Sequence, residues 1–164
     1  MRCVVLCLAA VALLAGPARA DWQTVIAKDG DGSDMAVMQG TAQYNFVAFL
    51  LCKKDSEKHV MLQWGDGKTP SSELKTVNDL TLTVKTDEGV HTSSGVWSDY
   101  GTGRDILEYA NFYETNEVAD FIGRAKDSVS FIFDSPSLKL HDGVVSFADG
   151  AADAAAKFNA FCPN

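Results

Sequence analysis

The segment from Tyr44 to Cys52 (YNFVAFLLC) is apolar at almost every position. A strand with apolar side chains on both alternating faces is typical of the middle of a sheet, where other layers cover it on each side. The neighbouring segments supply further strands. His59 to Trp64 follows a charged turn, which predicts a hairpin, and Leu80 to Thr86 alternates strictly between apolar and polar residues, as a half-exposed strand does.

Weaker strand signals occur elsewhere in the chain, separated by Gly, Asp, Asn or Pro residues that favour turns. They lie at Trp22–Ala27, Val90–Ser94, Ile106–Phe112, Val129–Phe133 and Val144–Phe147. The pattern predicts roughly six to eight strands in all.

Two later segments repeat apolar residues at helical spacing. We expect amphipathic helices at Asn116 to Lys126 and at Ala151 to Cys162, the second capped by Asp149. Strands in series with two helices late in the chain favour an α+β fold over strict strand-helix alternation. The expected fold is a mainly antiparallel β-sheet or sandwich with helices near residues 116–126 and 151–162.

Residues 1–20 (MRCVVLCLAAVALLAGPARA) are typical of a secretion signal that is cleaved after Ala20. One basic residue, Arg2, precedes an apolar run from Cys3 to Leu14. This run is about a dozen residues long, too short to remain in a bilayer as an anchor. We therefore expect one β-rich globular domain over residues 21–164, periplasmic or secreted, with no membrane anchor after cleavage.

Cleavage would remove Cys3 and Cys7 and leave Cys52 and Cys162. In an oxidising compartment these two remaining thiols are expected to form a disulfide, which would tie the last helix to the apolar strand. Two cysteines without a nearby histidine fall short of the four ligands of a structural zinc site. We expect no metal site and no cofactor.

The chain carries 14 basic and 22 acidic residues, a formal charge of −8. Cleavage would remove Arg2 and Arg19 and no acidic residue, which makes the charge −10. Such a charge disfavours nucleic acid as a partner and favours a basic one, although acidity can also serve solubility alone. The expected partner is another envelope or secreted protein, basic if the charge takes part in recognition.

Residues capable of chemistry lack the spacing that catalysis or metal binding needs. The acidic segment Lys28 to Met35 (KDGDGSDM) has neither the glycine nor the glutamate that a calcium-binding EF-hand loop requires, so it predicts a solvated turn, with weak calcium binding as the alternative. His59, His91 and His141 are isolated in the sequence and are expected at the surface, although they could converge in space. We therefore predict no catalytic residues.

Glycine and aromatic residues gather between Ser93 and Tyr113 (SSGVWSDYGTGRDILEYANFY). Exposed aromatic side chains in a glycine-rich segment often form a binding face. The alternative is that they fill the core beneath a twisted sheet. The residues of this candidate binding face are Ser94, Gly95, Trp97, Tyr100, Tyr109 and Tyr113.

Apolar residues, tryptophans and cysteines recur in a fixed order over most of residues 44–162. These positions are the strand ending at Cys52, Val60–Trp64, Leu80–Val84, Trp97, Phe121–Ile122, Phe147, Gly150, Phe158 and Cys162. Their order resembles that of type VI secretion accessory proteins of the VasI kind. It is more distantly similar to the invasion-associated locus B family, whose additional cysteine pairs are missing here. The resemblance implies a β-rich periplasmic accessory protein and carries over no catalytic residues. The leading hypothesis is thus an exported, non-catalytic binding or accessory protein.

A second resemblance concerns Ser94-Gly95-Val96-Trp97. These residues are similar to the Ser-Gly-aromatic motif of periplasmic C-type lysozyme inhibitors, with tryptophan in place of tyrosine. This resemblance implies inhibition of a basic cell-wall hydrolase. The acidity of the chain gives electrostatic attraction to such a partner the right sign.

Overall fold

The structure is a computed structural model that describes residues 21–40, 47–53, 58–64, 76–98, 105–109 and 115–162. These residues form nine strands and two helices, which confirms the predicted α+β class. The elements are β1 (Gln23–Lys28), β2 (Asp34–Gln39), β3 (Val47–Lys53), β4 (Lys58–Trp64), β5 (Thr81–Thr86), β6 (Gly89–Ser98), β7 (Asp105–Tyr109), α2 (Thr115–Gly123), β8 (Ser128–Ser135), β9 (Leu140–Phe147) and α3 (Ala151–Phe161).

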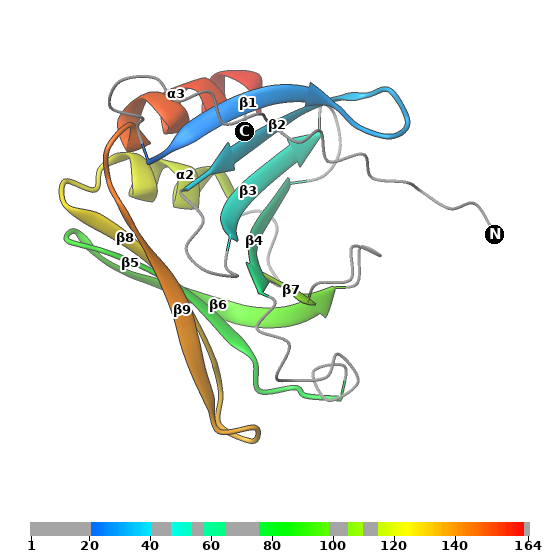
Figure 1. Cartoon of the computed structure of the whole chain (residues 1–164), viewed down its shortest axis with the longest axis vertical. Coiled ribbons are helices and arrows are strands. Elements are labelled where there is room, and N and C mark those ends of the chain that lie inside the picture. The colour runs from blue at the N-terminus through cyan, green and yellow to red at the C-terminus, as the bar shows by residue number, and fades with distance from the viewer. Residues whose placement is uncertain are drawn as a thin grey trace.

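The strands pair in the order β1-β2-β3-β4-β7-β6-β5-β8-β9, and every pairing is antiparallel. Strand β6 belongs to both halves of this sheet, because its first part pairs with β5 and its last part, from Gly95, pairs with β7. Gly95 lies close to Leu80, to whose carbonyl oxygen its N–H donates at 2.8 Å. Figure 1 shows β1–β4 in one half and β5, β8 and β9 in the other, at a large angle to it.

The two helices pack against each other and against the sheet, α3 on β1 and β2 and α2 on β4 and β5. The hydrophobic core lies between them and the sheet. The alternation that predicted β5 is confirmed there, since Leu82 and Val84 are fully buried. The largest fully buried side chains are Trp22, Met38, Leu50, Leu82, Phe131, Phe133 and Phe158. Among the described residues, neither helix has the length and apolar character of a membrane span.

The disulfide between Cys52 and Cys162 is confirmed, with the two Cα atoms 6.3 Å apart. Cys52 lies in β3 and Cys162 directly follows α3, so the bond joins the apolar strand to the last helix, as predicted. Both cysteines are buried. The bond is compatible with an oxidising location outside the cytoplasm.

The structure has nine strands rather than the predicted six to eight, and α2 ends at Gly123, three residues before the predicted end. Two further differences concern β2 and the start of α3. Strand β2 was not predicted, because Asp34 was assigned to the acidic turn, whereas it pairs with Lys28 as the first residue of β2. The prediction that Asp149 caps α3 was wrong. The N-cap is Gly150 in the left-handed region at φ 78°, and no side chain caps the helix. The carbonyl oxygen of Asp149 instead accepts a hydrogen bond from the N–H of Trp22.

Candidate binding surface

One face of β6, β5, β8 and β9 points away from the hydrophobic core. The strand register aligns its side chains in rows, which run from β6 through β5 and β8 to β9. We call this surface, together with Val96 of β6 and Phe147 of β9, the outer face. Its successive rows are Ser94, Thr81, Asp134 and His141, then Thr92, Thr83, Ile132 and Gly143, then Val90, Lys85, Ser130 and Val145.

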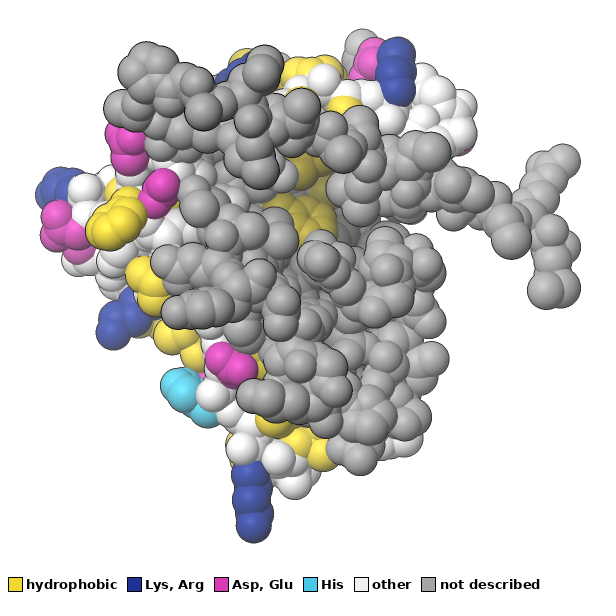
Figure 2. Space-filling view, viewed as in Figure 1, with side chains coloured by type: hydrophobic (Ala, Val, Ile, Leu, Met, Phe, Trp, Pro, Cys, Tyr) yellow, Lys and Arg dark blue, Asp and Glu magenta, His cyan; other side chains and the backbone are white. Residues whose placement is uncertain are grey.

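Most of the exposed large apolar side chains of the described residues lie on the outer face. Among the described residues, the exposed large apolar side chains are Ile26, Val90, Val96, Val145 and Phe147. All of them except Ile26 belong to the outer face, and Phe147 is 72 % exposed. Figure 2 shows hydrophobic side chains along the side of the molecule where β9 lies. Single exposed apolar residues are ordinary on a protein surface, but four of the five such side chains described here share one face.

The outer face has no excess of acidic side chains, although the chain as a whole is acidic. Of its residues only Lys85, Asp134 and His141 are ionisable, and the Nδ1 atom of His141 contacts the Oδ1 atom of Asp134 across β8 and β9. Hydroxyl groups make up much of the remainder, and those of Thr83 and Thr92 hydrogen-bond each other at 2.9 Å. The buried centre of a protein–protein interface is more apolar than the rest of a protein surface.

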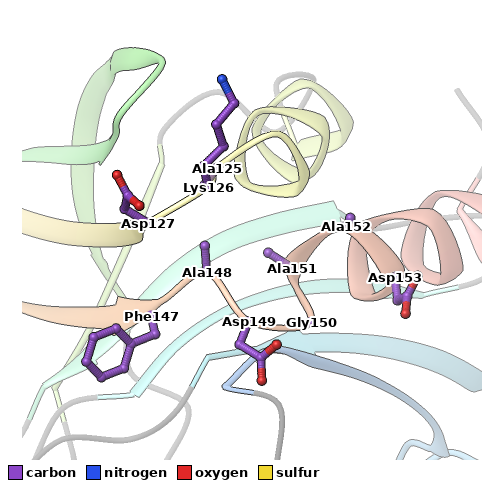
Figure 3. Close-up of a pocket in the computed structure, with 10 residues that line it drawn as sticks. All are labelled: Ala125, Lys126, Asp127, Phe147, Ala148, Asp149, Gly150, Ala151, Ala152 and Asp153. Carbon is purple, nitrogen blue, oxygen red and sulfur yellow. The ribbon is translucent and has the colours of Figure 1, made fainter.

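A pocket of about 480 Å³ adjoins Phe147 at one end of the outer face. Its walls are the segment after α2 and the connection from β9 to α3, and its lining residues are Ala125, Lys126, Asp127 and the continuous stretch Phe147–Asp153. Figure 3 shows that the side chains of Asp127, Asp149 and Asp153 do not converge on one point. Three acidic side chains and one basic side chain, Lys126, line the pocket, and the three carboxylates are not arranged to hold a metal ion.

Hydrogen bonds fix the two walls of the pocket relative to each other. The N–H of Ala148 donates to the carbonyl oxygen of Asp127 at 3.0 Å. The carboxylate of Asp87 accepts the N–H of Lys126 at 2.8 Å, and this bond holds the pKa of Asp87 below its usual value. The Nζ atom of Lys126 lies 3.3 Å from a carboxylate oxygen of Glu88. Hydrogen bonds of the main chain thus hold the two walls of the pocket in place beside Phe147.

The acidic segment between β1 and β2 forms a turn whose carboxylates already have partners. A carboxylate oxygen of Asp29 lies 2.5 Å from Nζ of Lys53, and this contact, with the N–H of Gly30, lowers the pKa of Asp29. Asp31 accepts the N–H of Ser33 at 2.8 Å. Within the described part of the chain, no three His, Cys, Asp or Glu side chains are grouped so that they could hold a metal ion.

Only some residues of the predicted binding face lie within the described part of the structure. Ser94 is exposed on the outer face, whereas a side chain at Gly95 would point at Leu80. Gly95 pairs with Tyr109 of β7, and Trp97 lies two residues further along β6. The side chains of Trp97 and Tyr109, and all of Tyr100 and Tyr113, lie outside the described residues.

The described histidines occupy different environments. His91 is half-buried on the core side of β6, with its ring 6.3 Å from that of Phe121. His141 is exposed on the outer face, as predicted for a surface histidine. The side chain of His59 lies outside the described residues. Sequence reasoning missed Val90, Val96, Val145 and Phe147 as surface residues, because only the strand register shows that they share a face.

Comparisons of the chain with protein-family models, with curated proteins and with solved structures gave no match. The function proposed below therefore rests on the outer face and the adjoining pocket.

Proposed function

We propose that the chain is an exported, non-catalytic binding protein whose protein partner docks on the outer face. The observation that carries this proposal is that four of the five exposed large apolar side chains of the described residues, Val90, Val96, Val145 and Phe147, lie on one face. The signal-like residues 1–20 support export, and the Cys52–Cys162 bond suits a periplasmic or secreted location.

The chemistry of the partner follows from charge. Residues 21–164 carry a formal charge of −10, and Asp127, Asp149 and Asp153 surround the pocket beside Phe147. A partner with an apolar patch bordered by lysine or arginine complements this surface. Attraction between opposite charges raises the association rate and makes it sensitive to salt. The partner is therefore a basic protein of the cell envelope or the surrounding medium.

Capture from an envelope extract with matched variants tests the proposal. Phe147→Ser removes the most exposed apolar side chain of the outer face, whereas Ile26→Ser removes an exposed apolar side chain of β1, outside that face. Wild type and Ile26→Ser should retain the same basic protein at low salt, and Phe147→Ser should bind it at least about tenfold more weakly. Equal retention by all three forms, or recovery of no specific partner, would contradict the proposal.

Inhibition of a basic cell-wall hydrolase is a narrower second candidate, favoured by the exposure of Ser94 on the outer face. A stoichiometric excess of the protein should then slow a C-type lysozyme at low salt. Ser94→Arg and Trp97→Ala should each abolish the effect, while Ile26→Ser should retain it. An unchanged lysozyme rate with excess wild-type protein would rule this candidate out and leave the broader proposal to the capture experiment.

A further inference from the structure

One edge of β9 is open, because β9 is the last strand in the order of the described sheet. Two hydrogen bonds show which main-chain groups lie at this edge. The N–H of Ala148 donates to the carbonyl oxygen of Asp127, directly before β8, whereas the N–H of Phe147 donates to Oδ2 of Asp21, directly before Trp22 and β1. Successive main-chain groups of a strand point in alternate directions. The β9 residues whose main-chain groups point to the open edge are therefore His141, Gly143, Val145 and Phe147.

Such an edge is a template for a further strand, because its unpaired N–H and carbonyl groups can bind those of another chain. Strand β9 has eight residues and includes neither proline nor lysine, two residues that commonly block sheet edges. Val145 and Phe147 add side chains that are 48 % and 72 % exposed. An open edge with these properties favours association unless other groups occupy it.

Two carboxylates occupy this edge. The Oδ2 atom of Asp21 accepts the N–H of Phe147 at 2.9 Å, where the start of β1 meets the end of β9 (Figure 1). The Oδ1 atom of Asp142 accepts the N–H of Gly143 at 2.8 Å. Both hydrogen bonds are exposed, and the N–H of Val145 lies between them along the edge. Each carboxylate takes a donor that a neighbouring strand would use and places a negative charge beside it.

We propose that the open edge of β9 is a self-association surface that Asp21 and Asp142 keep closed, and that a second copy of this chain pairs with it when these carboxylates are removed. A twofold axis relates the two copies, so β9 pairs with β9 in an antiparallel arrangement. Neither export nor a basic partner is needed for this pairing, so the binding function proposed above can stand or fall without it.

The sequence of β9 suits a second copy of itself. With the twofold axis at Val144, Gly143 of one copy lies opposite Val145 of the other, and His141 lies opposite Phe147. The main-chain groups of these opposed residues all point to the edge, so each pair can exchange main-chain hydrogen bonds. Gly143 has no side chain, which leaves room on the outer face for Val145 of the second copy. The outer faces of the two copies then form one continuous surface.

The same register explains why the two carboxylates oppose pairing. Because Phe147 lies opposite His141 of the second copy, Asp21 comes close to Asp142 of that copy, and this happens at both ends of the paired strands. Like charges at facing positions of neighbouring strands are destabilising. Removal of Asp21 and Asp142 therefore frees two N–H donors and also relieves this repulsion.

Sedimentation equilibrium of the oxidised, folded protein at neutral pH tests the proposal. Asp21→Ala/Asp142→Ala removes both carboxylates from the edge, whereas the control Glu117→Ala/Asp120→Ala removes two exposed carboxylates from α2. The edge variant should dimerise with a dissociation constant at least about tenfold lower than that of wild type or of the control. Equal constants for the edge variant and the control, or an edge variant that stays monomeric, would overturn the proposal.

A second pair of variants locates the contact. Val145→Pro, added to the edge variant, removes an N–H that faces the open edge and no hydrogen bond to β8. Val145→Thr keeps this N–H and the branched shape of the side chain. The dimer should be lost with Val145→Pro and kept with Val145→Thr. A dimer that survives Val145→Pro would place the contact elsewhere and overturn the proposal.

Circular dichroism and the disulfide show whether the edge variant folds. If it does not, Asp142→Ala alone, which loses only a bond to the N–H of the next residue, replaces it. The control is then Glu117→Ala. Asp142→Ala should dimerise more tightly than this control, and equal dissociation constants for the two would count against the proposal in the same way.

Discussion

The side-chain amide of Asn116 donates a hydrogen bond of 2.6 Å to the carbonyl oxygen of Cys162. The first turn of α2 thereby holds the residue that follows α3 and carries the disulfide. The same amide donates to Oδ1 of Asn159 at 3.2 Å, and the amide of Asn159 donates to Asp120 at 2.6 Å. The two helices are thus joined by one buried, one partly buried and one exposed hydrogen bond as well as by apolar packing.

Replacement of Asn116 by alanine should therefore destabilise the protein. Loss of the amide leaves the buried carbonyl of Cys162 without this donor, which typically costs about 1 to 3 kcal/mol of unfolding free energy. Urea denaturation measures the effect. As a control, Asp120→Ala removes an exposed partner of Asn159 and should cost less than about 1 kcal/mol. Equal losses for the two variants would show that burial of the Cys162 carbonyl is unimportant.

Reduction of the disulfide should lower the melting temperature strongly. The bond closes a loop with a sequence separation of 110, for which restriction of the unfolded chain is worth about 4 to 5 kcal/mol. We expect the melting temperature to fall by roughly 10 to 20 °C in reductant. The double variant Cys52→Ala/Cys162→Ala should melt at the lower temperature and should not respond to reductant. A response from the double variant would assign the shift to another effect.

Gly143 should not tolerate a side chain. A Cβ atom there would lie 2.2 Å from the carbonyl oxygen of Phe131 and 3.0 Å from Cα of Ile132, both main-chain atoms of the neighbouring strand. Gly143→Ala should therefore force β8 and β9 apart and cost about 1 to 3 kcal/mol. Ser130→Ala, on the adjacent strand, should change stability by less than about 0.5 kcal/mol. Thermal unfolding of both variants measures the difference in stability. A Gly143→Ala variant as stable as wild type would refute this prediction.

The carboxylate of Asp79 makes the stability of the β8–β9 hairpin depend on pH. It accepts the hydroxyl of Ser135 at 2.8 Å and both the N–H and the hydroxyl of Ser137, and these bonds lower its pKa below 3.8. Because the folded pKa is depressed, the stabilisation is present above the unfolded pKa and is lost as the pH falls through the folded pKa.

Asp79→Asn should consequently lower the unfolding free energy at pH 7, and the difference from wild type should shrink as the pH falls below about 4. Urea denaturation of both proteins between pH 7 and pH 2 measures this difference. Asp142→Asn is the control, since its carboxylate accepts only its neighbour's N–H, from Gly143, among the described contacts. A difference between wild type and Asp79→Asn that is constant over this range would exclude protonation of Asp79 as the cause.

The sequence was sufficient to predict the elements whose apolar residues repeat with a clear period. Leu82 and Val84 alternate with polar residues in β5 and are buried as expected. Of the residues expected on one face of the C-terminal helical segment, Ala154, Phe158 and Cys162 are buried and Phe161 is partly buried. Local periodicity reflects burial on one face, so a short window suffices.

The features that went unpredicted depend on residues far apart in the chain. Strand β2 begins at Asp34, whose role as the partner of Lys28 becomes evident only once the register of the hairpin is known. The outer face requires the register of four strands, and the contact between Asp21 and Phe147 joins residues separated by 126 positions. A short stretch of sequence predicts neither the outer face nor this contact, because the residues involved come together only when distant strands pair.

The disulfide also has a temporal consequence. If the chain is exported from its N-terminus, as proposed, Cys52 would reach a disulfide oxidant before Cys162 does, because the two are 110 positions apart. The thiolate of Cys52 would displace one thiolate of the oxidant and form a mixed disulfide with the other sulfur. The thiolate of Cys162 would then attack Cys52 and release the oxidant's second thiolate. A polypeptide truncated ahead of α3 keeps Cys52 without its native partner. The native disulfide can therefore form only in a chain that includes α3 and Cys162.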